Sequence, residues 1–156
     1  MASIIVPSNL TVTISESYEL NGVTYGNTLS KIYTSNSQVS QRVMNIEGKG
    51  DSGNVFTNIL ALSTADGQGQ VKKTDYKYFR ITNLDTVNTL NLRIYNGTEY
   101  FAFEVSPAST FLLQDAGTDS PATASTVIAF SDITLIAGQS SSVADTVDVE
   151  FIIVTA

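Results

Sequence analysis

The feature that most constrains this chain is a period-two alternation of apolar and polar side chains that recurs along its length. At the start, Leu10, Val12 and Ile14 alternate with hydroxyl residues, and near the end the apolar residues of 147–153 alternate with acidic ones. Successive side chains of a strand point to opposite faces of a sheet, so this pattern predicts strands with one buried face. No segment combines a helical period with helix caps. The chain is therefore predicted to be all β.

An Asn-Gly pair at residues 21–22 predicts the first hairpin, because both central residues of a type I′ turn need a positive φ angle. A two-residue turn there would place Leu20 opposite Val23 and Tyr18 opposite Tyr25. Residues 26–27 are Gly-Asn, a pair that interrupts the strand pattern, and we expect a bulge or register change at that point.

A second Asn-Gly pair, at residues 96–97, predicts another two-residue turn. Its register would pair Leu92 with Phe101 and Leu90 with Phe103. Both pairs then fall on one face, which agrees with the alternation of the two strands.

The remaining apolar segments predict further strands, separated by loops rich in Gly, Pro, Ser and Asn. We expect a single domain, residues 1–156, folded as an antiparallel β-sandwich of the jelly-roll or Greek-key kind with eight to ten strands. Residues 1–8 could form an extended arm. The further strands are expected at 38–47, 54–63, 73–82, 110–113, 126–137 and 147–154, and the loops at 48–53, 65–70, 115–125 and 138–142. Residues 54–63 could instead form a short helix, although Val55 and Phe56 favour a strand.

The chain contains no Cys, His or Trp, and this composition excludes several kinds of site. Without His there is no imidazole base, no Ser-His-Asp system and no His metal ligand. Without Cys there is no thiolate nucleophile, zinc cluster, iron–sulfur site or disulfide. We predict a protein that is not an enzyme and that has no catalytic residues, no cofactor and no metal site.

Two patterns could still support chemistry, and both have a simpler interpretation. Residues 48–53 fit G-x-G-x-x-G, but a dinucleotide site needs that pattern between a strand and a helix, so a flexible turn is favoured. Glu16 with Glu19, or Asp148 with Glu150, could be the carboxylate pair of a glycosidase, although no other feature marks them as a site. The acidic loop 115–119 could bind calcium weakly, but it lacks the ligand spacing of a calcium loop.

The net charge of −7 is distributed unevenly along the chain. All eight Lys and Arg residues lie at or before Arg93, with seven acids, whereas eight acids and no base follow. A cluster of Lys72, Lys73, Lys77 and Arg80 stands among aromatic residues. It could be a solvated edge strand guarded by lysines, a contact with the acidic part of a neighbouring subunit, or a nucleic-acid surface. The acidic net charge disfavours nucleic acid as a partner.

Both ends of the chain carry short apolar runs that are suited to burial against a neighbour. They are too short to span a membrane, and the start lacks the basic segment of a signal peptide, so a protein that is made in the cytoplasm without an export signal is expected. Alternatively, the C-terminal run lies inside a sheet. Together with the basic cluster, these runs give the interface candidates, namely Ile4, Ile5, Val6, Lys72, Lys73, Lys77, Arg80, Phe151, Ile152 and Val154.

The stretch from Lys77 to Leu113 resembles small virion proteins of tailed bacteriophages. The resemblance rests on YFRITNLD at 78–85, LNLRIYNGTEY at 90–100 and VSPASTFLL at 105–113, with Pro-Ala where such proteins often have Pro-Gly. It covers about a quarter of the chain.

This resemblance implies a capsid cement or decoration subunit that works in the virion and is often a trimer. The expected partners are the major capsid protein or other virion subunits, and neither nucleic acid nor a membrane. A second hypothesis is a fibre head, adhesin or other receptor- or glycan-binding module, with Tyr33, Tyr95 and Tyr100 as candidates for stacking on sugars.

Overall fold

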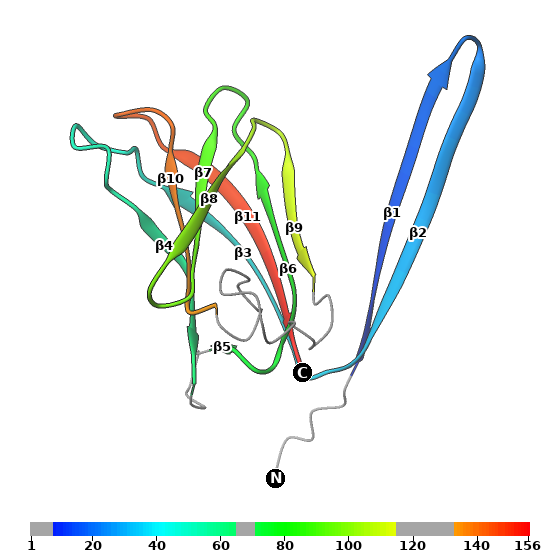
Figure 1. Cartoon of the computed structure of the whole chain (residues 1–156), viewed down its shortest axis with the longest axis horizontal. Helices are drawn as coiled ribbons and strands as arrows, with labels where there is room; N and C mark the ends of the chain where they lie inside the picture. The colour runs from blue at the N-terminus through cyan, green and yellow to red at the C-terminus, as the bar shows by residue number, and fades with distance from the viewer. Residues whose placement is uncertain (1–7, 65–70, 115–132) are drawn as a thin grey trace.

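The computed structural model describes residues 8–64, 71–114 and 133–156, and every regular element in this part of the chain is a β-strand (Figure 1). The strands are β1 (Ser8–Leu20), β2 (Val23–Asn36), β3 (Gln38–Ile46), β4 (Thr57–Ser63), β5 (Val71–Lys72), β6 (Tyr76–Asn83), β7 (Leu90–Tyr95), β8 (Tyr100–Val105), β9 (Thr110–Gln114), β10 (Leu135–Ser140) and β11 (Val147–Thr155).

Nine of these strands form two sheets that pack face to face, as the predicted sandwich fold requires. One sheet has the order β5-β4-β10-β7-β8 and the other the order β3-β11-β6-β9. All ladders within them are antiparallel except the short β4–β5 pair. The third sheet contains only β1 and β2 and stands apart from the sandwich.

The core lies between the inner faces of the two sheets. Leu90, Leu92 and Ile94 of β7 are fully buried, and on the opposite sheet the rings of Phe79 and Phe151 lie 6.1 Å apart. Burying side chains of this kind contributes about 1.5–3 kcal/mol each. The other buried apolar members are Ile46, Ile59, Leu62, Tyr76, Ile81, Val105, Ile133, Ile136, Val147, Val149 and Ile153.

The C-terminal strand β11 is central, since it pairs with β3 on one side and β6 on the other. Phe151 faces the core, and Val154, on the opposite face, is also fully buried. Of the two explanations for the apolar C-terminal run, the structure supports the position inside a sheet.

The first hairpin has the predicted turn and register. Asn21 and Gly22 have φ angles of 53° and 77°, and Leu20 pairs with Val23. The expected bulge at residues 26–27 is wrong, because Gly26 pairs regularly with Ser17 and β2 continues to Asn36. A Cβ on Gly26 would lie 2.4 Å from the carbonyl oxygen of Glu16, so this glycine permits a close backbone approach.

The second hairpin has a longer turn than predicted. Leu92 pairs with Phe103 rather than Phe101, which shifts the register by two residues and keeps the same face inward. The cause is the side chain of Asn96, whose Oδ1 accepts hydrogen bonds from the backbone N–H groups of Thr98 and Glu99. An Asn side chain that bonds to the backbone in this way stabilises a wider turn than the two-residue type I′ form.

Several predicted boundaries also differ from the structure. The strand expected from Lys73 begins at Tyr76, and the strand expected at 54–63 begins at Thr57. Residues 126–132 of the strand expected at 126–137 lie outside the described residues, and the strand in the described part begins at Leu135. The loop expected at 138–142 is wrong in its first half, because β10 continues to Ser140. A Cβ on Gly138 would meet the side chains of Ile59 and Leu90 at 2.9 and 3.0 Å, so this glycine marks close packing within a strand and not a loop.

Candidate assembly surface

The β1–β2 hairpin, called the arm below, is a two-stranded ribbon that leans away from the sandwich and joins it at the end opposite its turn (Figure 1). Its strands have 13 and 14 residues, and a rise of ~3.3 Å per residue makes the arm about 40 Å long. Every residue from 13 to 32 is exposed. The arm is therefore the part of the described chain that projects furthest from its own core.

The arm has one apolar face and one hydroxyl-rich face, because cross-strand partners share a face. The hydroxyl face carries Thr13–Ser30 and Ser15–Thr28 side-chain hydrogen bonds of 3.0 and 3.1 Å. The register places on the apolar face Leu10, Val12, Ile14, Tyr18, Leu20, Val23, Tyr25, Leu29 and Tyr33, interrupted by Glu16, Asn27 and Lys31.

Beyond the base of the arm, nothing in the described chain covers the apolar face. Tyr18 and Tyr25 stack on each other with their ring centroids 5.3 Å apart, yet each stays about half exposed. Contiguous exposed apolar surface of this kind is typical of surfaces that contact another molecule, so the arm is the candidate site. The exposed members and their exposed fractions are Ile14 38%, Tyr18 60%, Leu20 58%, Val23 51%, Tyr25 45% and Leu29 66%.

The base of the arm is anchored on the outer face of the four-stranded sheet by a small apolar cluster. Tyr33, Tyr78 and Val154 are its buried members, and the rings of the two tyrosines lie 5.9 Å apart. Burial raises the pKa of Tyr78, although the nearby Arg80 acts in the opposite direction. Leu10, Val12, Leu112 and Ile152 pack around this cluster.

Hydrogen bonds fix the same junction. The Lys77 ammonium donates to the carbonyl oxygen of Thr34 at 2.7 Å, and the Asn36 amide donates to the carbonyls of Ser8 and Tyr33, each at 2.9 Å. The apolar and polar contacts together set the direction in which the arm leaves the sandwich.

The basic cluster predicted as an interface makes several contacts within the chain. Arg80 forms an ion pair of 2.7 Å with Glu150, and Lys77 holds the base of the arm. Lys72 lies in β5 and Lys73 follows it. The aromatic residues interleaved with this cluster, Tyr76, Tyr78 and Phe79, are buried, so their rings are not available to stack on bases.

Of the two apolar ends of the chain, the structure describes only the C-terminal one. Phe151 is 3% exposed in the core, and Val154 is covered by the base of the arm. Ile152 packs partly buried beside it. Ile4, Ile5 and Val6 lie outside the described residues, as does the acidic loop 115–119.

A second exposed feature is an aromatic group on the outer face of the five-stranded sheet. The guanidinium carbon of Arg93 lies 3.7 Å from the ring centroid of Phe56 and 4.4 Å from that of Tyr100. Tyr95 lies beside Tyr100, with centroids 5.3 Å apart, and Tyr100 is half exposed. Tyr33, the third aromatic candidate for binding sugars, is 6% exposed and is not available for stacking.

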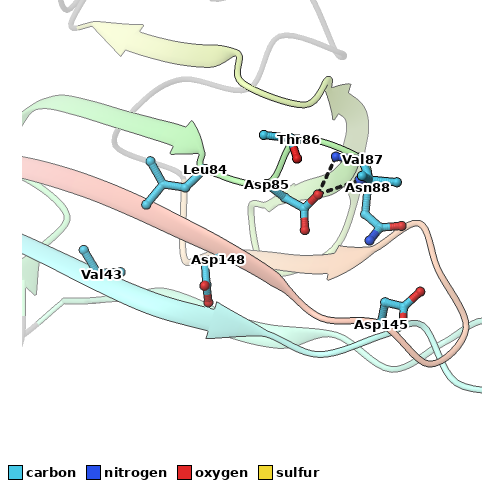
Figure 2. Close-up of a pocket in the computed structure, with 8 residues that line it drawn as sticks. All are labelled: Val43, Leu84, Asp85, Thr86, Val87, Asn88, Asp145 and Asp148. Atoms are coloured by element: carbon cyan, nitrogen blue, oxygen red, sulfur yellow. Dashed lines mark hydrogen bonds between the residues drawn. The ribbon is translucent and has the colours of Figure 1, made fainter.

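The described chain also has a shallow hollow of about 560 Å³, lined by residues of β3, β11 and two loops (Figure 2). Its three carboxylates make local hydrogen bonds. Asp85 accepts from the backbone N–H groups of Val87 and Asn88, which lowers the pKa of Asp85. Asp148 accepts from Asn45, and Asp145 accepts from the hydroxyl of Ser142. No group of three or more acidic residues in the described part of the chain is arranged to hold a metal ion.

The two patterns considered for chemistry have structural explanations. The G-x-G-x-x-G segment joins β3 to β4, and no helix follows it. Glu16 and Glu19 lie on opposite faces of the arm. Asp148 and Glu150 share a face, but their partners are Asn45 and Arg80.

The sequence predicted the β1–β2 hairpin that forms the arm, but it did not predict that this hairpin is separate from the sandwich. Alternation indicates a strand with an apolar face, and it does not say what covers that face. One signal was present in the sequence, namely that the predicted apolar face is interrupted by Glu16 and Lys31. The strand lengths of 13 and 14 residues, which exceed the usual five or six, became visible only in the structure, because an interruption was expected at residues 26–27.

A scan against protein-family models finds no match, and searches of the curated proteins and of the solved structures find none either. Within the described residues, no helix has the length and apolar character needed to cross a membrane.

Proposed function

We propose that this chain is a non-enzymatic structural subunit of a virion, of the capsid cement or decoration kind, that bridges neighbouring capsid subunits and works as a homo-oligomer. The observation that supports this proposal is the arm, a ribbon about 40 Å long with an uncovered apolar face. A two-stranded sheet is marginally stable by itself, so a projecting ribbon with an uncovered apolar face does not add to the stability of a monomer. An assembling subunit can use it to reach a neighbour.

The mechanism follows from the division of the chain into a rigid part and a projecting part. The sandwich supplies a packed body, and the arm supplies apolar side chains that are about half exposed. Covering them fully gains about half of the 1.5–3 kcal/mol that burial of a fully exposed side chain provides. Several arm contacts repeated over a particle would add up to a large resistance to internal pressure. The partners of this mechanism are the major capsid protein, other virion subunits and copies of this chain.

Quantitative mass spectrometry of purified virions tests the proposal. We expect the chain to be present in many copies, in a fixed ratio to the major capsid protein, and to stay bound through density-gradient purification. A single copy per particle would contradict the cement role, and absence from the particle would contradict any structural role there.

A glycan- or receptor-binding role is the second candidate, and the aromatic group of Phe56, Arg93, Tyr95 and Tyr100 favours it. Sugars stack on exposed aromatic faces. A glycan array would show a specific signal that Tyr100→Ala abolishes, whereas Tyr18→Ala, which removes an exposed tyrosine from the arm, would leave that signal unchanged. An array without a specific signal would contradict this role.

A further inference from the structure

Beyond its base, the arm pairs with no third strand in the described part of the chain. Between Thr11 and Ser30, β1 and β2 form backbone ladders only with each other, so each strand has a second edge that no strand occupies. Proteins usually protect such edges with prolines, several lysines or bulges. Between Ser8 and Asn36 there is no proline, the charged residues are Glu16, Glu19 and one lysine, and the ladder is regular from Leu10 to the turn. The arm is therefore open to pairing with another strand along nearly its whole length.

We infer that the partner at these edges is the arm of a second copy of this chain, with β1 of one copy pairing antiparallel to β2 of the next, and that the copies close into a ring. This inference rests on the proposed structural role and names the contact that carries it.

The choice of a second arm follows from the length and the pattern of the strands. A partner strand must be extended for about 12 residues and must alternate apolar and hydroxyl side chains in the same phase. The arm itself meets both conditions. The Thr13–Ser30 and Ser15–Thr28 hydrogen bonds within one arm could then be repeated between arms.

The number of hydrogen bonds is sufficient for a specific contact. An antiparallel ladder of about 12 residues forms roughly one backbone hydrogen bond per residue, and a typical protein–protein interface has about 10 ± 5 direct hydrogen bonds. One shared edge between two arms therefore supplies about as many hydrogen bonds as an ordinary protein–protein interface.

Ring closure follows from counting the free edges. A two-fold dimer that pairs β1 with β1 leaves the β2 edge of each copy exposed. Pairing β1 with β2 of the next copy uses both edges of every arm, and closure leaves no edge free. In such a ring all arms point the same way and all neighbouring strands are antiparallel.

The base of the arm indicates which face turns toward the sandwich. Leu10, Val12 and Tyr33 of the apolar face already pack on the four-stranded sheet of their own chain. In the ring the apolar face would therefore lie against the surrounding sandwich domains, and the hydroxyl face would line a hydrated axis.

The hollow at Asp85, Asp145 and Asp148 is a poorer partner for the arm. The outer half of the arm carries Glu16 and Glu19 and no basic residue, so docking there would bring like charges together. Charge therefore favours pairing at the edges of the arm over insertion of its tip into this hollow.

Disulfide trapping tests the pairing, since the natural chain has no cysteine. One protein carries Ser30→Cys, and it is mixed in turn with proteins that carry Thr11→Cys, Thr13→Cys or Ser15→Cys. We expect one of these three mixtures to form a disulfide-linked heterodimer on mild oxidation. Thr13→Cys by itself should give no linked dimer, because equivalent β1 strands of a ring lie about 10 Å apart, beyond the ~7 Å Cα separation that a disulfide spans.

A dominant Thr13→Cys homodimer would overturn the inference in favour of a two-fold dimer. Absence of all three heterodimers would overturn the pairing itself.

The mass of the particle in solution tests closure. Light scattering should show one discrete oligomer of three or more copies, and a monomer, a dimer or an open-ended polymer would overturn the ring. Leu29→Asp should weaken association at least about tenfold, since it places a charge where apolar surface is covered. The neighbouring Ser30→Asp, on the hydroxyl face, is the matched control and should keep the oligomer. If both variants weakened association equally, the assignment of the two faces would be wrong.

The ring and the structural role can fail separately. If the chain is abundant in virions but is a monomer in solution and forms no disulfide-linked heterodimer, the structural role stands and the ring is wrong. A chain that forms the ring and is absent from virions keeps the ring and loses that role.

Discussion

At the scale of single residues, buried polar side chains hold the loops that the alternation cannot specify. Asn83 is fully buried, and its amide donates to the carbonyl oxygens of Asn88 and Val105 at 3.0 and 3.1 Å. Its Oδ1 accepts from the backbone N–H of Asp85. One side chain thus joins the β6–β7 turn to the end of β8, and removing it would leave buried carbonyl groups without a donor.

Tyr76 gives a prediction about pH at the same scale. Burial raises the pKa of Tyr76 well above its ordinary value of 10.0, and Tyr33 and Tyr78 add to this. Below about pH 10 both the folded and the unfolded chain keep the proton. Above it the unfolded chain loses the proton first, so the free energy of unfolding falls as pH rises, by up to about 1.4 kcal/mol per pH unit for one group.

We therefore expect Tyr76→Phe to reduce the loss of stability between about pH 9.5 and pH 11, measured as the urea midpoint at each pH. Part of the loss should persist, because burial also raises the pKa of Tyr78. Tyr18→Phe, at an exposed position, is the control and should behave as the natural chain does. An unchanged slope in Tyr76→Phe would show that this tyrosine is not the source of the loss.

At the scale of elements, the arm and the sandwich have different sources of stability. The sandwich strands bury their apolar faces against each other, whereas the arm is anchored at its base by Tyr33, Tyr78 and Val154. The long ladder beyond that anchor is held by backbone pairing and by the stacked Tyr18 and Tyr25. Local loss of the anchor should consequently affect the arm much more than the sandwich.

Tyr33→Ala tests this separation by hydrogen exchange. Removing a buried aromatic ring costs about 3–5 kcal/mol, so we expect the amides of β1 and β2 to lose protection while those of β7 and β10 keep it. Ile32→Ala, the neighbouring position on the opposite face, which is 60% exposed, is the matched control and should leave both regions protected. Equal loss of protection in the sandwich would mean that the two parts unfold as one unit.

At the scale of the whole molecule, the uneven charge described by the sequence is partly neutralised within the chain. Arg80 meets Glu150, which brings a base of the first part of the sequence to an acid of the last part. The predicted attraction between basic and acidic regions therefore occurs at least once inside a single chain. The proposed association between copies therefore rests on the arm and not on the uneven charge.

If copies join through their arms, the thermal midpoint should depend on protein concentration. A hundredfold increase in concentration favours the associated state by about 2.7 kcal/mol, which raises the midpoint of a chain of this size by roughly 5–10 °C. Differential scanning calorimetry at two concentrations would measure this. Leu29→Asp, which weakens association, should lower the midpoint at each concentration. A natural chain whose midpoint does not change with concentration would argue against association.

The alternation by itself determined the fold class, the position of most strands and which face of each strand is apolar. It could do so because side-chain direction along a strand depends only on local geometry. The first turn was predictable for the same reason, since Asn21 and Gly22 accept positive φ angles without help from the rest of the chain. The second turn was not, because the side chain of Asn96 competes with the backbone for its hydrogen bonds.

What only the tertiary structure decided is which apolar faces find a partner. Leu90 and Leu29 both belong to alternating strands, yet one is fully buried and the other is 66% exposed. Sequence pattern records that a face is apolar, while burial depends on which distant strands pack against it. The uncovered face of the arm, and with it the surface proposed for assembly, therefore emerged only from the three-dimensional arrangement of the chain.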